Sequence, residues 1–117
     1  MLVIRAQQME VLGAYMAAAF EKDCVALLRR DYPEITRDAP DDELRAFVRD
    51  GIERAAQYGI DTVSNVQRWL DLMMRLGAHF DEDPRCAAVQ AALAKDALPA
   101  EARLDEAMAL AVRLDQQ

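Results

Sequence analysis

The stretch from Thr62 to Phe80, TVSNVQRWLDLMMRLGAHF, limits the possible folds more than any other part of this chain. Read as a helix, it carries apolar side chains at spacings of three and four along one stripe, and two further leucines widen that surface. A helix that is apolar over so wide an arc needs neighbours on several sides, so we expect it at the centre of the fold. The stripe consists of Val66, Trp69, Leu70, Met73, Gly77 and Phe80, extended by Leu72 and Leu76.

Composition favours an all-α protein with one core. The chain has 117 residues, 53% of them hydrophobic, which suffices for one domain and is short for two. Alanine, the best helix former, supplies 22 residues, whereas aromatic residues make up only 6%. We therefore predict a single helical domain over residues 1–117, packed through close contacts between helices.

Helical periodicity and end signals predict five helices. The segment 33–40, PEITRDAP, is bounded by prolines and predicts a loop, from which Ile35 folds back onto the core. Asp83 and Pro84 are typical of an N-cap and a first helical residue. The predicted helices cover approximately residues 4–30, 41–59, 62–80, 84–95 and 100–114.

The sequence Tyr58-Gly59-Ile60 predicts a sharp turn between the second and third helices. Glycine after a helix adopts the left-handed conformation readily, and an apolar residue just beyond it packs on the last helical turn. So short a connection makes the two helices antiparallel neighbours. We predict a compact bundle of about five helices around this antiparallel hairpin, with the first helix and the two C-terminal helices covering it.

Net charge argues against two classes of partner. The chain carries 14 basic and 21 acidic residues, a formal charge of −7, and neither half is basic. Binding to nucleic acid or to anionic membranes requires cationic groups, so we expect neither partner. The apolar run 2–4 is far shorter than a signal-peptide core, and no stretch approaches membrane-spanning length, so we expect a cytoplasmic protein.

The single histidine, His79, invites three chemical interpretations. It could act as a general base beside Asp81, Glu82 or Asp83, or as a ligand of a metal or a haem. The chain has no recognisable nucleophile motif, no HExxH, no CxxC and no EF-hand pattern around the acidic cluster 81–83. We therefore interpret His79 as a residue at a helix end, and predict no enzymatic activity, no cofactor and no metal.

The two cysteines, Cys24 and Cys86, stand alone in the sequence. An isolated pair in a cytoplasmic protein favours reduced thiols packed in the core over a disulfide.

Several apolar side chains are candidates for a surface that binds another protein. Methionine repacks easily against different partners, although most of the methionines fit a core better. The side of the central helix that carries Leu72 and Leu76 would be the leading candidate if the C-terminal helices left it bare. The candidate partner-binding residues are Leu72, Met74, Leu76, Trp69 and Tyr15.

Three segments, IRAQQME, RDGIERAAQYGIDT and WLDLMMRLGAHFDEDP, together resemble small, uncharacterised helical proteins encoded in bacterial type VI secretion gene clusters, near the spike and its effectors. The resemblance covers approximately residues 4–93 and carries no active-site residue. It implies an accessory role, such as loading or folding a secreted effector or connecting it to the spike. The alternative is an immunity protein that neutralises a toxin. Either way the expected partner is another protein, an effector, spike component or toxin, and self-association remains open.

Overall fold

The computed structural model describes residues 14–115, and the side chains of residues 18–114. Over this range the chain forms six α-helices and two short 3₁₀ helices, with no β-strand, which confirms the predicted all-α class. The elements are α2 (Ala14–Asp31), α3 (Pro33–Thr36), α4 (Asp41–Gln57), α5 (Val63–Leu76), η1 (Phe80–Glu82), η2 (Pro84–Cys86), α6 (Ala87–Leu93) and α7 (Ala100–Asp115).

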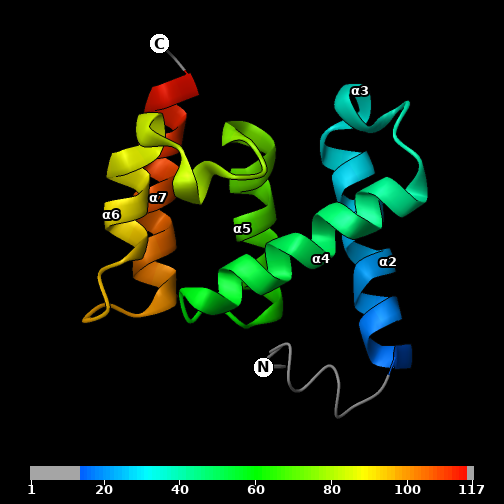
Figure 1. Ribbon diagram of the computed structural model, residues 1–117, viewed down its shortest axis with the longest axis horizontal. Helices are drawn as coiled ribbons and strands as arrows, with labels where there is room; N and C mark the ends of the chain where they lie inside the picture. The colour runs from blue at the N-terminus through cyan, green and yellow to red at the C-terminus, as the bar shows by residue number, and fades with distance from the viewer. Residues whose placement is uncertain (1–13, 116–117) are drawn as a thin grey trace.

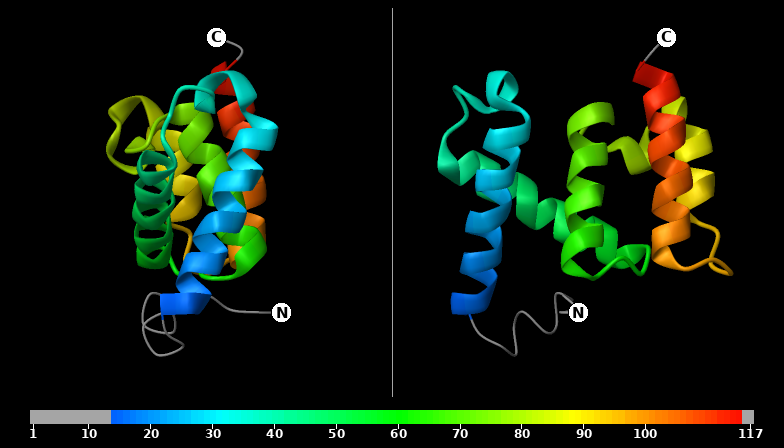
Figure 2. Two further views of the ribbon diagram at one scale, coloured as in Figure 1. Left: turned by 90° about the vertical axis from the view of Figure 1, so that its right-hand side faces the viewer. Right: turned by 180° about the vertical axis from the view of Figure 1, so that it is seen from behind.

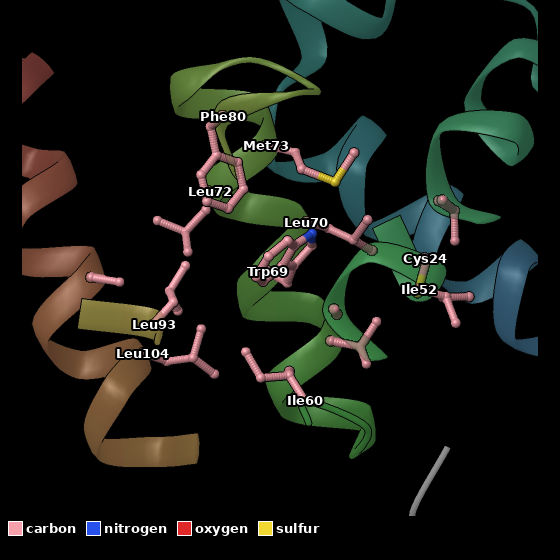
Figure 3. Close-up of a cluster of buried hydrophobic side chains, with 14 of the residues drawn as sticks. Cys24, Ile52, Ile60, Trp69, Leu70, Leu72, Met73, Phe80, Leu93 and Leu104 are labelled. Atoms are coloured by element: carbon pink, nitrogen blue, oxygen red, sulfur yellow. The ribbon is translucent and has the colours of Figure 1, made fainter. Parts of the chain in front are cut away.

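Helix α5 lies at the centre of the bundle, as predicted. It contacts α4 on one side and α7 on the other, and Figures 1 and 2 show it between α2 and the α6–α7 pair. Trp69 and Leu72 have no exposed surface, and Leu70 and Met73 are 1% exposed. Figure 3 shows Leu72 lying toward Leu93 of α6 and Leu104 of α7. The C-terminal helices therefore cover the second apolar side of α5.

The predicted turn joins α4 and α5 into the hairpin. Gly59 has a φ of 72°, which glycine adopts without a steric penalty. The backbone N–H of Ile60 donates to the Ala55 carbonyl at 3.0 Å, and the Ile60 side chain is fully buried. Figure 1 shows that α4 crosses α5 obliquely and extends beyond it to α2.

The central helix is shorter than predicted. It ends at Leu76, because Gly77 has a φ of 113° and leaves the helical region. Phe80 lies in η1 instead, where its ring returns to the core beside Trp69, at 4.9 Å between ring centroids. Tyr58 also contacts Trp69, with ring centroids 5.2 Å apart. The three aromatic side chains therefore pack together, with Phe80 positioned by η1 and not by the predicted longer helix.

The fourth predicted helix also begins later, because residues 84–86 form η2 before α6 starts at Ala87. Asp83 caps this segment as predicted, since its side chain accepts a hydrogen bond from the Arg85 N–H at 3.0 Å. The first predicted helix corresponds to α2 over its C-terminal part, and residues 4–13 lie outside the described range.

The segment 33–40 departs most from the prediction. Pro33 begins a short helix, α3, because a proline at the first helical position has no N–H that needs a partner. Ile35 points outward with 66% of its surface exposed, so the predicted contact with the core is wrong. Thr36 occupies the buried position instead, at 1% exposure. Its hydroxyl donates to the Tyr32 carbonyl at 2.8 Å, which satisfies the polar group that burial would otherwise penalise.

No helix in the described range is long and apolar enough to cross a membrane.

Candidate functional site

The structure removes two of the five predicted partner-binding residues from the surface. Trp69 and Leu72 are completely buried, because α6, α7 and the aromatic turn residues cover them, and they offer no surface to a partner in this conformation. Met74 and Leu76 are half-buried and pack against the edge of the core. The side chain of Tyr15 lies outside the described part of the structure.

The groups considered for chemistry do not assemble into a site. His79 is exposed immediately before η1. Among the described residues, no three His, Cys, Asp or Glu side chains lie close enough to hold a metal ion. Cys24 and Cys86 are both buried and unpaired, as predicted. Burial, with smaller effects from Asp23 and Glu21, raises the pKa of Cys24 to about 12, which disfavours the nucleophilic thiolate.

The clearest candidate for a binding site is the segment around α3. Three large apolar side chains are exposed in the described range, and Ile35 has by far the largest exposed fraction, compared with 40% for Leu98 and for Val112. Ile35 lines a shallow, open depression of about 320 Å³ together with Asp31, Tyr32, Pro33 and Glu34. We call residues 31–43 the α3 platform.

Arg29 of α2 fixes the backbone of the α3 platform. Its guanidinium donates to the carbonyls of Thr36 and Ala39, both at 2.9 Å, and forms an ion pair with Asp41 at 2.7 Å. One side chain thus holds the end of α3, the following turn and the start of α4. The exposed Ile35 is consequently presented from a backbone that is held on both sides, unlike a residue in a free loop.

Tyr32 joins the α3 platform to the central helix. Its hydroxyl donates a hydrogen bond to the Asp71 carboxylate of α5, and Asp71 also pairs with Arg75 at 3.1 Å. Burial and this hydrogen bond raise the pKa of Tyr32 to about 12, so the hydroxyl keeps its proton at all physiological pH values. The platform is therefore anchored to α5 as well as to α2 and α4.

The α3 platform also concentrates the negative charge of the chain. Residues 31–43, DYPEITRDAPDDE, contain six acidic residues and one basic residue, Arg37, a net charge of −5 out of the total of −7. In water these charges repel anionic surfaces and attract cationic ones over a distance of about 10 Å.

Sequence reasoning missed this site because it placed Ile35 in the core. A signal was nevertheless present in the sequence, since the acidic residues crowd around a single isoleucine between two prolines, Pro33 and Pro40. What the sequence could not show is that Thr36 takes the inward position and leaves Ile35 outside.

Comparisons with models of protein families, with curated proteins and with solved structures found no match to this chain.

Proposed function

We propose that this chain is a non-catalytic protein-binding protein that uses the α3 platform as its contact surface. In this proposal it acts as an adaptor or chaperone-like accessory factor for a secreted effector or spike component of type VI secretion. The secretion context comes from the sequence resemblance. The observation that carries the binding role is Ile35, the most exposed large apolar side chain in the described range, held on a fixed backbone.

A rigid, exposed apolar side chain suits binding for an energetic reason. Ordering a flexible segment on association costs free energy, and a segment that is already ordered avoids much of that cost. Burying the exposed part of Ile35 in a partner then adds a favourable hydrophobic contribution. A single exposed apolar residue in a free loop would lack the first advantage.

The test is co-purification of the chain with the products of its neighbouring genes at low salt, using wild type and the variants Ile35→Ala and Val112→Ala. Val112 is the matched control, because it is an exposed aliphatic residue on α7, away from the α3 platform. We expect a neighbouring product to co-purify with wild type and Val112→Ala, and to be lost or strongly reduced with Ile35→Ala. If no neighbouring product binds wild type, the proposed function is wrong.

The acidic charge of the α3 platform supports a second candidate, an immunity protein that covers the cationic active-site cleft of a toxin. Complementary charge accelerates such association and favours the correct partner. Co-expression with the adjacent effector distinguishes the two roles. An immunity protein abolishes the toxicity of that effector, whereas an adaptor leaves the toxicity of the folded effector unchanged or increases its yield.

A further inference from the structure

We infer that the α3 platform binds a basic segment of its partner, one that places an apolar side chain in the depression beside Ile35 and lysine or arginine side chains on either side. This inference rests on the proposed function, because it specifies the partner's chemistry at the same site. The proposed occupant is a protein segment with both features. A purely cationic surface would leave Ile35 uncovered, and a purely apolar surface would leave the carboxylates unpaired.

The first argument concerns which carboxylates remain available. Two of the six acidic residues already have cationic neighbours, since Asp31 pairs with Arg30 at 2.9 Å and Asp41 with Arg29 at 2.7 Å. The other four are exposed and lie in no ion pair within 4.0 Å among the described side chains. These four are Glu34, Asp38, Asp42 and Glu43.

The second argument concerns their arrangement. Glu34 and Ile35 are adjacent and both line the depression, and Asp38 lies four residues after Glu34, in the turn that follows α3. Asp42 and Glu43 lie in the first turn of α4, where Arg29 holds the neighbouring Asp41 against α2. The apolar contact therefore has carboxylates before it and after it in the chain, and two of them, Asp31 and Glu34, line the same depression as Ile35.

The third argument concerns what the platform rejects. A partner segment with acidic residues beside its apolar side chain would place like charges together, which costs binding free energy. A neutral segment would gain nothing from the four carboxylates, and it would desolvate without compensation any of them that it covered. A basic segment alone avoids both costs, and its binding must weaken as salt screens the charges.

The probe is a synthetic peptide of alternating lysine and leucine, compared with a lysine–serine peptide and a glutamate–leucine peptide of equal length. Binding is measured by amide chemical-shift changes in NMR spectra of the full chain, which report the dissociation constant and the residues affected. We expect the lysine–leucine peptide to shift amides of residues 31–43 most strongly. The lysine–serine peptide should bind more weakly, and the glutamate–leucine peptide should not bind.

Two double variants test whether the charge acts locally. Glu34→Gln with Asp38→Asn removes two charges from the α3 platform. The control, Glu53→Gln with Asp96→Asn, removes two exposed charges elsewhere, so the two double variants have the same net charge. We expect the platform variant to weaken lysine–leucine binding about three- to tenfold, and the control variant to change it less than twofold. Equal effects of the two variants, or shifts spread over the whole acidic surface, would overturn the inference.

The same variants separate this inference from the proposed function. If a co-purifying neighbour is lost with Ile35→Ala but is insensitive to Glu34→Gln with Asp38→Asn and to added salt, the chain binds a partner that is not basic. The proposed function then stands and the inference fails. If no neighbouring product binds while the lysine–leucine peptide binds at residues 31–43, the surface chemistry stands and the proposed function fails.

Discussion

The Nη1 atom of Arg54 lies 2.8 Å and 3.1 Å from the two carboxylate oxygens of Asp81, although the two residues are 27 positions apart. This contact joins the last turn of α4 to η1, the 3₁₀ helix that returns Phe80 to the core. The Nε atom of Arg54 also donates to Asp50 at 3.0 Å. The side chains of Arg54 and Asp81 are only 16% and 6% exposed, so solvent screens this pair far less than an ion pair on the surface.

The first prediction is that Asp81→Asn lowers the free energy of unfolding by about 2 kcal/mol, because it removes the most buried carboxylate that pairs with Arg54 and leaves only the more exposed Asp50 and Glu82. Urea denaturation followed by circular dichroism measures the change. Arg85→Met is the control, since Arg85 pairs with Asp83 on the surface and its side chain is 84% exposed. That control should leave the urea midpoint nearly unchanged, and equal effects of the two variants would contradict a special role for the buried pair.

The second prediction concerns the close approach of α4 to α5 at Gly51. A Cβ atom added there would lie 2.5 Å from Leu70 Cδ2 and 2.9 Å from Met73 Sδ, so buried side chains would have to move. Overpacking of a core costs about 1 to 3 kcal/mol, and alanine recovers about 1 kcal/mol of helix propensity. We expect Gly51→Ala to lower the free energy of unfolding by about 1 kcal/mol.

A double-mutant cycle tests the stated cause. In a chain that already carries Leu70→Ala, the nearer of the two contacts is gone and the flexible Met73 side chain can move into the vacated space, so the Gly51→Ala penalty should shrink. A Gly51→Ala penalty that is the same in both backgrounds would show that contact with Leu70 is not the source of the cost.

The third prediction concerns Arg103 of α7, which is 7% exposed and binds three backbone carbonyls. Its guanidinium donates to Tyr58 at 2.7 Å, to Leu93 at 2.8 Å and to Leu98 at 3.1 Å. It thereby connects the end of α4, the end of α6 and the loop before α7. Arg103→Met leaves these carbonyls without that donor, so we expect a loss of about 3 kcal/mol and a fall in Tm of roughly 10 °C by calorimetry.

Two further variants sharpen the test of Arg103. Arg103→Lys should recover only part of the stability, because an ammonium group cannot reproduce the planar fork of a guanidinium. Arg113→Met, at an exposed position on the same helix, should leave Tm within about 2 °C of wild type. Full stability in Arg103→Lys would mean that charge, rather than the geometry of the three hydrogen bonds, is what matters.

The fourth prediction concerns alkaline pH and Tyr32. The pKa of Tyr32 is about 12 in the folded chain and 10.0 for an unperturbed tyrosine. Between these values the unfolded chain loses the proton and the folded chain keeps it, so the stabilisation is complete below about pH 10 and is lost as pH rises toward 12. Ultraviolet titration of tyrosinate should show a late-titrating group in wild type that is missing in Tyr32→Phe, in addition to Tyr58, whose pKa is also raised by burial.

Stability measured across the same pH range provides the second readout. Tyr32→Phe should be less stable than wild type at neutral pH, because Asp71 loses a hydrogen-bond donor, and its stability should fall less steeply above pH 10. Identical alkaline slopes in the two proteins would contradict the assignment to Tyr32.

The elements with regular patterns could be predicted from sequence. The stripe along α5 depends on apolar residues spaced three and four apart, and the turn after α4 depends on the local conformation of glycine. Both can be recognised in a short stretch of sequence. The Leu72 side of α5 was predicted to be covered by the C-terminal helices, and Figure 3 shows Leu93 of α6 and Leu104 of α7 lying there. The covering also explains why Trp69 and Leu72 were poor candidates for a partner surface. Large apolar residues at the centre of a helical stripe are buried by the protein's own helices, so they are not available to a partner.

The position of Ile35 could not be predicted in the same way. In a segment of eight residues bounded by prolines, Ile35 and Thr36 are neighbours about 100° apart around the short helix α3, and the rotation of that helix about its axis decides which one points inward. Arg29, Tyr32 and Asp71 set that rotation through hydrogen bonds to α2, α4 and α5, and these partners are 7 to 39 positions apart in the chain.

By itself the sequence determined the helical class, the central position of α5, the hairpin turn and the acidic character, because each depends on composition or on short-range spacing. Tertiary structure alone decided which apolar residue remains outside, how Phe80 returns to Trp69 and where Arg54 and Arg103 find their partners. Those outcomes depend on hydrogen bonds and packing between segments distant in sequence, where a single polar contact between helices can select among backbone arrangements that local preferences leave nearly equal in free energy.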